Sequence, residues 1–163
     1  MNILSLLHED MREYLISAFS LPQNDKTIVR GYNNLNPIPK QAIIMTFRTN
    51  GHIDQMSREY DGENLVIFNS VRGTMQLDFY GEGSFDKAQE ISTLWNTIYT
   101  TELLENCVPL RTPAVRDLSF VNEAGKYEYR FLLDLELQYN TNYQKTVKIL
   151  EDASQTNVEL NNV

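Results

Sequence analysis

The sequence of 163 residues has the length of a single domain and is long enough to bury a sizeable core. Hydrophobic residues make up 42% and charged residues 22%, which is ordinary for a globular protein, and the formal net charge is -8. An acidic surface repels nucleic acid and anionic membranes at long range, and Lys and Arg are scattered without a basic run, so the composition argues against both as principal partners.

Cysteine and histidine give no sign of redox or metal chemistry. Cys107 is the single cysteine, so it cannot form an intrachain disulfide, and with only His8 and His52 it makes no metal-ligand cluster. A catalytic pairing of Cys107 with a distant histidine lacks a local signature, so a buried hydrophobic role is the better interpretation. We expect neither a metal nor a cofactor.

The amino-terminal residues have the composition of a helix rather than of a targeting segment. They acquire charge within ten positions and lack a basic leader and a small-residue cleavage site. No apolar run approaches the roughly 20 residues that cross a bilayer. We therefore expect no membrane contact, and a protein that stays in the cytoplasm unless a larger assembly carries it out.

The first third of the chain alternates between helix, strand and loop signals. Apolar side chains recur at three- and four-residue steps over residues 3–19, which predicts a helix that ends before Pro22. Residues 27–32 are a short strand candidate, and residues 33–40, rich in Asn and Pro, predict an extended loop. Residues 41–47 are apolar on both faces, which is typical of a strand inside a sheet.

Two glycine dipeptides divide the next segment. Asn50-Gly51 predicts a tight turn and Asp61-Gly62 a hairpin turn, with weakly alternating residues between them. Residues 63–80 predict one long strand, or two, with a bulge or kink near Gly73. Alternation places Met75, Leu77 and Phe79 on one face and Thr74, Gln76, Asp78 and Tyr80 on the other.

Residues 75–91, MQLDFYGEGSFDKAQEI, begin as a strand and end as a helix. Glycine-rich turns of this kind often hold phosphate, but here the Lys and Ser or Thr of a Walker loop and the third spaced glycine of a dinucleotide fingerprint are absent. Glu82 and Asp86 also occupy the place that a phosphate would take. A glycine corner before a helix capped by Ser84 or Asp86 is the better interpretation. The apolar stripe of this helix comprises Ala88, Ile91, Leu94, Trp95, Ile98, Tyr99 and Leu103.

The last third contains the clearest strand. Residues 110–120 are expected to be partly extended and residues 122–126 to form a turn. Residues 126–139 alternate between an apolar and a polar face, which is typical of an antiparallel strand with one buried side. The apolar face comprises Tyr127, Tyr129, Phe131, Leu133, Leu135, Leu137 and Tyr139.

Two chemical alternatives arise on this strand. Asp134 and Glu136 share its polar face and could form the carboxylate pair of a hydrolase, but such residues on an exposed strand usually face water. The tyrosines Tyr127, Tyr129 and Tyr139 could stack single-stranded nucleic acid, but without accompanying Arg and Lys a core or interface role is favoured. Nothing in these patterns supports catalysis.

The order of elements predicts an α+β fold. Clustered strands with helices between them favour a mostly antiparallel sheet with two main helices packed on it. No repeat or linker divides the chain, so residues 1–150 are expected to form a single domain. Residues 151–163 are polar and rich in Asn, which predicts a flexible tail.

The strand ending MQLDFYG, followed by a Ser/Phe/Asp-led helix that contains a Trp, resembles the phage neck terminator family, relatives of tail terminator proteins. Upstream IVRGYNNLNPIPKQAIIMTF and downstream LRTPAVRDLSFVNEAGKYEYRFLLDLELQY fit as well, so the similarity covers roughly residues 27–140. The resemblance implies a tail-terminator-like α+β fold and a structural virion protein without catalytic residues. Such proteins form rings, usually hexameric, that end the tail tube and join it to the head connector of a tailed phage.

The resemblance also implies partners. These are further copies of the chain, the tail tube protein and head connector or adaptor proteins, with DNA only passing through the lumen. It places the protein in the virion neck or tail, and in the host cytoplasm during assembly. A small non-viral α+β binding module without catalysis is the competing class, and a small enzyme of unrecognised type is a third.

The polar segment 50–64 offers the best candidate for a contact. Its turns would project from the sheet, so its charged residues are predicted to lie in a hairpin that faces a neighbour or the lumen. An ordinary solvated hairpin is the alternative. The candidate residues are Asp54, Arg58, Glu59 and Asp61.

Overall fold

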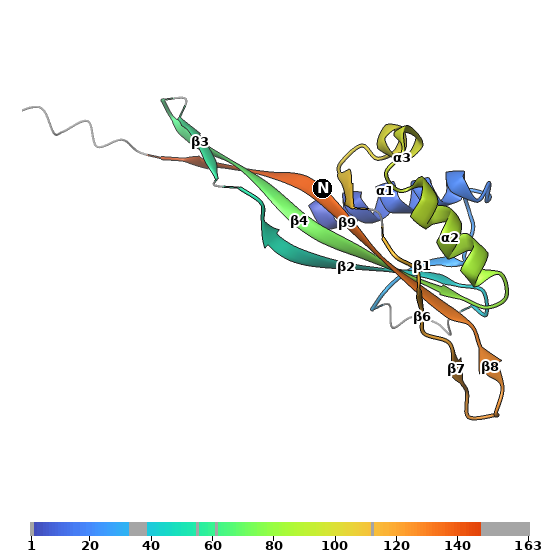
Figure 1. Cartoon of the computed structure of the whole chain (residues 1–163). Coiled ribbons are helices and arrows are strands. Elements are labelled where there is room, and N and C mark those ends of the chain that lie inside the picture. Colours follow the sequence, from blue (N-terminus) through green and yellow to red (C-terminus); the bar gives the residue numbers. More distant parts are fainter. Residues whose placement is uncertain (1, 33–38, 55, 61, 112, 148–163) are drawn as a thin grey trace, which may run out of the picture.

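The fold is organised around two antiparallel strands of 17 residues each, β4 and β9 (Figure 1). The structure, a computed structural model, describes residues 2–32, 39–54, 56–60, 62–111 and 113–147. Its elements in chain order are α1 Ile3–Ala18, β1 Ile28–Arg30, β2 Ile43–His52, β3 Ser57–Tyr60, β4 Asn64–Tyr80, α2 Ser84–Leu94, α3 Ile98–Leu103, β5 Val108–Arg111, β6 Arg116–Asp117, β7 Phe120–Val121, β8 Tyr127–Glu128 and β9 Arg130–Thr146.

One mixed sheet contains most of the strands. Its order is β1-β2-β4-β9-β5, with β3 on β4 and β6 on β9, while β7 and β8 form a separate hairpin. Only the β1–β2 pair is parallel among the described strands. The three helices pack on one side of the sheet (Figure 1). The predicted α+β fold with a mostly antiparallel sheet is therefore confirmed.

The core lies between the helices and the inner face of the sheet. The alternation predicted for β4 is confirmed on this side, where Met75, Leu77 and Phe79 are all buried. Trp95 and Tyr14 bring α1 and the end of α2 together, with ring centroids 6.1 Å apart in an edge-on arrangement. Other buried residues of the core include Leu7, Met11, Leu15, Ile43, Met45, Ala88, Ile91, Leu133, Leu135 and Leu137.

The helix predicted after Gly83 is divided into α2 and α3. The hydroxyls of Thr97 and Thr100 both donate to the carbonyl of Leu94, at 2.7 Å each, and such side-chain bonds compete with helix continuation. The break turns Ile98 to solvent, where it is 76% exposed, so its predicted place in the apolar stripe is wrong. The structure therefore has a short third helix beside the two main ones.

Close packing of the backbone explains why glycine occupies the corner before α2. Gly81 has φ +89°, and a Cβ there would lie 2.6 Å from the carbonyl oxygen of Lys40. The residue preceding α2 is Gly83, with no side-chain capping bond, so the predicted cap by Ser84 or Asp86 is wrong. Ser84 is instead the first residue of the helix, and its buried hydroxyl has no hydrogen-bond partner among the described residues.

The Asn50-Gly51 dipeptide is a bulge and not a turn. Thr49 pairs with Gly73 and Gly51 with Arg72, so Asn50 is an extra residue within β2. β4 pairs with β9 without a break, so the irregularity predicted near Gly73 lies in β2 and not in β4. Gly73 leaves room for Phe47, since a Cβ there would be 2.5 Å from the Phe47 ring.

The strand predicted over residues 126–139 differs at both ends. Tyr127 pairs with Val121 in the separate hairpin, which leaves Tyr127 75% and Tyr129 53% exposed instead of buried on the apolar face. At the other end β9 continues past Tyr139 to Thr146, because β4 pairs with it throughout. The predicted tail, residues 151–163, and residues 33–38 of the predicted loop lie outside the described residues.

Candidate functional site

A projecting part of the sheet carries the candidate residues. We call it the β-arm: β3, residues 64–70 of β4 and residues 140–146 of β9, which together extend away from the helices (Figure 1). The hairpin predicted at Gly62 is confirmed, because β3 pairs antiparallel with β4. Its strands run in register from Ser57 opposite Phe68 to Tyr60 opposite Leu65.

The structure brings two of the four candidate charges onto β3. Arg58 and Glu59 are exposed neighbours on this strand, so their side chains lie on opposite faces of the β-arm. Asp54 is exposed in the bend that precedes β3. Asp61 lies outside the described residues. The role of these residues in a contact stays a prediction.

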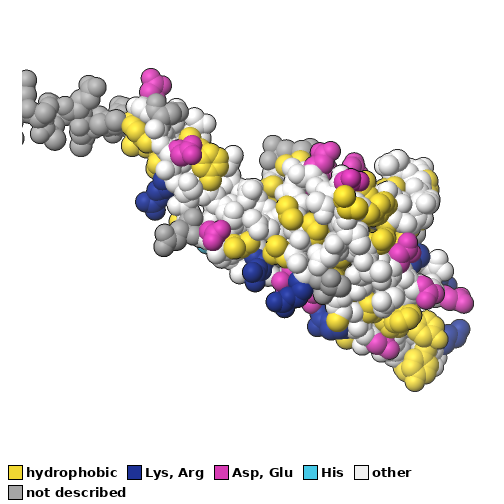
Figure 2. Space-filling view, turned by 45° about the horizontal axis from the view of Figure 1, so that its top comes forward, with side chains coloured by type: hydrophobic (Ala, Val, Ile, Leu, Met, Phe, Trp, Pro, Cys, Tyr) yellow, Lys and Arg dark blue, Asp and Glu magenta, His cyan; other side chains and the backbone are white. Residues whose placement is uncertain are grey.

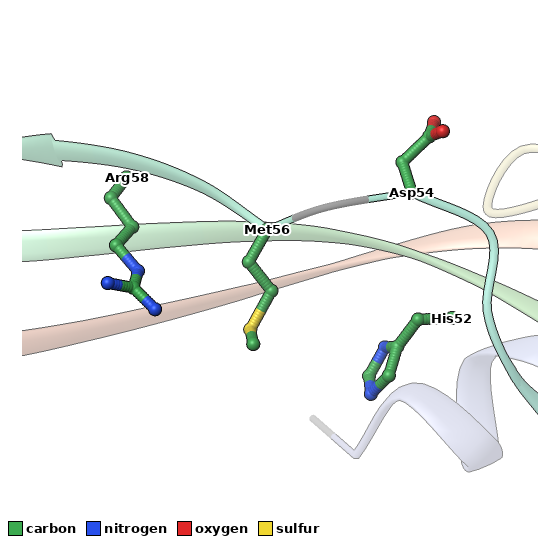
Figure 3. A pocket seen from close by; sticks show the side chains of 4 residues that line it. All are labelled: His52, Asp54, Met56 and Arg58. Carbon is green, nitrogen blue, oxygen red and sulfur yellow. The ribbon is translucent and has the colours of Figure 1, made fainter.

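A shallow hollow of about 510 Å³ lies beside β3 and is lined by His52, Asp54, Met56 and Arg58 (Figure 3). The side chains of His52, Met56 and Arg58 point to one side of the ribbon, whereas Asp54 points away from them (Figure 3). His52 is held by Asn69, whose Nδ2 lies 2.6 Å from Nδ1 of the imidazole. All four lining residues are exposed, so this hollow can contact another surface but does not exclude water from a reaction.

The carboxylates that suggested hydrolase chemistry are engaged in ion pairs. Asp134 binds Arg48 at 2.8 Å through one oxygen and Arg116 through the other. Glu136 lies 4.0 Å from Arg111. These pairs connect β2, β6, β5 and β9 across the helix-free face of the sheet, where each carboxylate has a structural partner. Within the described part of the chain, no group of three His, Cys, Asp or Glu residues could hold a metal ion.

Asp78 lies on the predicted face of β4, opposite to that of Leu77 and Phe79, and is nevertheless buried. It is only 4% exposed, and one of its oxygens accepts bonds from Nε and Nη2 of Arg130 at 2.9 and 2.7 Å. Gln76 donates to the other oxygen at 2.8 Å. Arg130 also lies over the ring of Tyr80, with its guanidinium carbon 5.4 Å from the centroid. This buried pair joins the two central strands at the end of the sheet farthest from the β-arm.

Cys107 has the buried role predicted for it. Burial, with a further contribution from the nearby Asp10, raises the pKa of its thiol to about 12. A thiol with this pKa is protonated at neutral pH and is a poor nucleophile. Asp10 itself accepts bonds from the backbone and side-chain amides of Asn106, at 2.7 and 2.9 Å, and so ties α1 to the segment after α3.

A second projection lies at the end opposite the β-arm. The β7–β8 hairpin carries exposed apolar side chains, and Figure 2 shows hydrophobic atoms gathered at this tip. The sequence placed its tyrosines in a core or an interface, and no sequence signal distinguishes these two roles for an alternating strand. The exposed members are Leu118, Phe120, Val121, Tyr127 and Tyr129.

Comparison with known protein families gives a match over nearly the whole chain. A family model described as "Phage neck terminator protein" matches residues 5–162, nearly the whole chain, including the β-arm and the β7–β8 hairpin. No curated protein matches the sequence. No helix among the described residues is long and apolar enough to span a membrane.

Proposed function

The chain belongs to the phage neck terminator family, and we propose that copies of it assemble into a ring at the head–tail junction of the virion. The protein is thus a structural component of a phage neck. In the proposed role, a ring of six copies ends the tail tube and binds the head connector or adaptor, and it assembles in the host cytoplasm. DNA passes through its lumen without being held by it.

The observation that carries this proposal is the pair of projections within a family-matched chain. The β-arm and the β7–β8 hairpin extend in opposite directions from the helix-covered body (Figure 1). Both carry apolar side chains that the other described residues leave exposed. Exposed apolar clusters of this kind mark protein–protein contacts, and two at opposite ends suit a protein with neighbours on both sides.

The charged residues of the β-arm fit a neighbour better than a lumen. Met56 is 48% exposed in the same hollow as Asp54 and Arg58, and Tyr60 is 46% exposed beside Glu59. A thioether and a phenol ring gain from burial against protein and gain nothing from a water-filled channel. We propose that the exposed residues Asp54, Arg58 and Glu59 lie at the rim of a contact between copies.

Solution mass is the first test. Light scattering coupled to size exclusion, over a range of protein concentrations, should give a species of about six times the 18.9 kDa chain mass. Purified tail tubes should bind the protein at one end, as seen by negative-stain electron microscopy. A protein that stays monomeric at every concentration and also fails to bind tube ends would refute the proposal.

A further inference from the structure

The edges of the main sheet differ in whether their outward backbone N–H and C=O groups have hydrogen-bond partners. At the β1 edge, the carbonyl of Ile28 accepts a hydrogen bond from Nη1 of Arg12 at 3.1 Å. The backbone N–H of Ile28 donates to the carboxylate of Asp25. Burial raises the pKa of Asp25, but bonds from Thr27 and Ile28 and the charge of Arg12 outweigh it and lower that pKa. Side chains therefore close the β1 edge to a further strand.

The opposite edge of the body is also closed. β5 contains Pro109, which has no N–H to offer to a further strand. Proline on an edge strand is one of the common devices that prevent edge-to-edge pairing. β6 consists only of Arg116 and Asp117, which is too short to guide the addition of a strand.

β9 has an open edge within the β-arm. The N–H of Val147 donates to the carbonyl of Glu63 at 3.0 Å, so odd-numbered residues of this strand bond towards β4. The even-numbered residues point their backbone groups the other way, where the pairing with β5 ends at Gln138. Beyond that residue no described strand pairs with this side of β9. The residues with outward backbone groups are Asn140, Asn142, Gln144 and Thr146.

This edge lacks protective features. Residues 140–146 contain no proline, and Lys145 is their only charged residue. Natural sheets normally blunt a long exposed edge with charges, proline, bulges or a covering segment. The same chain closes its β1 and β5 edges in such ways, so the open β9 edge stands out as a surface suited to pairing.

β3 supplies a second open edge on the other side of the β-arm. The backbone N–H of Ile53 donates to the carbonyl of Ser70. The even-numbered residues of β4 therefore form their backbone hydrogen bonds on the side of β4 where β3 lies. Ser57 and Glu59 face Phe68 and Val66, so they bond to β4, whereas Arg58 and Tyr60 direct their backbone groups outward. No described strand pairs with that outer side.

We propose that a second copy of this chain places the outer edge of its β3 along the open edge of β9, so that neighbouring β-arms form one continuous sheet. The inference rests on the proposed ring and specifies a contact that holds it. Two different edges on opposite sides of one ribbon make a heterologous contact, which is the kind that closes a ring by rotation. Main-chain bonds across such an edge provide affinity by strand addition.

Side chains beside the two edges match this arrangement. Tyr60 is 46% and Tyr143 64% exposed. Their cross-strand partners, Leu65 and Ile67, are two residues apart on β4, so both tyrosines lie on the same face of the β-arm. Pairing of β3 with the neighbour's β9 brings Tyr60 of one copy within reach of Tyr143 of the next. Aromatic pairs of this kind stabilise adjacent strands.

Proline substitution on β9 tests the proposal directly. Asn142→Pro and Gln144→Pro each remove an N–H that points away from β4, so the bonds between β4 and β9 remain. We expect the double variant to fold as the wild type does, by circular dichroism and Trp95 fluorescence. Its self-association should be weaker by roughly tenfold or more, since two intersubunit hydrogen bonds and the close approach of the strands are lost. The matched control, Asn142→Ala with Gln144→Ala, keeps both N–H groups and should assemble like the wild type.

The outcomes separate this contact from the ring itself. A folded proline variant that assembles as well as the alanine control would overturn the strand pairing and leave the ring proposal standing. A wild-type protein that neither self-associates nor binds tube ends would overturn the ring.

Hydrogen exchange provides a readout that needs no folded variant. The outward amides of residues 140, 142, 144 and 146 in the wild type should exchange rapidly in the dilute monomer and become protected on assembly, whereas the odd-numbered amides between them are already bonded to β4. Complete protection in the monomer would show that the chain covers its own edge, and would refute the proposal.

Discussion

Loss of Arg130 should destabilise the folded chain strongly, because the carboxylate of Asp78 is buried beneath it. Breaking a buried ion pair by removing one partner costs about 3–5 kcal/mol when the other charge stays buried. The Arg130 side chain is 32% exposed, so water can partly replace it, and Gln76 keeps its bond to the second oxygen. Arg130→Met retains much of the apolar stem. We therefore expect a loss of about 2–3 kcal/mol in the free energy of unfolding, or roughly 5–10 °C in Tm for a chain of this size.

The measurement is guanidinium unfolding followed by tryptophan fluorescence. Trp95 is the only tryptophan and is fully buried, so its emission reports loss of the core. Unfolding is repeated at several protein concentrations, because self-association raises apparent stability.

A double-mutant cycle isolates the pair. Asp78→Asn replaces the carboxylate with a neutral amide of similar shape. In that background Arg130→Met should cost less than about 1 kcal/mol, mostly from the lost stacking on Tyr80. An equal cost of Arg130→Met in both backgrounds would show that the buried charge is not the reason for the loss.

Three further predictions concern the core. Burial raises the pKa of Tyr14 to about 12, above its usual value of about 10, so stability that is complete below pH 10 should fall as pH rises to 12, by up to roughly 2–3 kcal/mol. Tyr14→Phe should flatten this decline in unfolding curves measured from pH 9 to 12; an unchanged slope would assign the decline to other groups. Gly73→Ala should cost about 1–3 kcal/mol through collision with the Phe47 ring, and Phe47→Leu in the same chain should recover part of the loss; additive losses would argue against the collision. Cys107 should resist a thiol reagent at pH 8 in the native state and react after unfolding; rapid native reaction would contradict its burial.

The elements that could be predicted are those in which the periodicity of apolar residues matches the face that packs into the core. The helix Ile3–Ala18 buries most of its predicted apolar stripe, with Leu4 left 42% exposed, and the strand Asn64–Tyr80 buries Met75, Leu77 and Phe79. Asn50-Gly51 was misassigned because a positive-φ glycine suits both a turn and a bulge. Which of the two forms depends on the register with β4, which is distant in sequence. The continuation of β9 beyond Tyr139 in the β-arm escaped prediction for a related reason, since no helix covers it and its residues need not alternate.

The projecting hairpin at Gly62 was predicted from its turn residues, and a contact role for its charged residues stays a prediction. Asn50 and Gly51 lie within β2 instead of in the predicted turn. The open edge of residues 140–146 could not be foreseen, since backbone pairing leaves no trace in side-chain composition. The same holds for Asp78, whose burial depends on Arg130 being brought beside it by the pairing of Tyr80 with that residue.

The uninterrupted register of β4 with β9 has a mechanical consequence. The two strands stay paired from Asn64 opposite Thr146 to Tyr80 opposite Arg130. The part of this strand pair under the helices and the part in the β-arm are therefore one continuous hydrogen-bonded unit. A force applied at the tip is carried by the backbone into the layer that supports the helices. The angle between body and tip is then fixed by the stiffness of a hydrogen-bonded ladder, and a load between neighbouring molecules would bend the whole sheet instead of rotating a flexible joint.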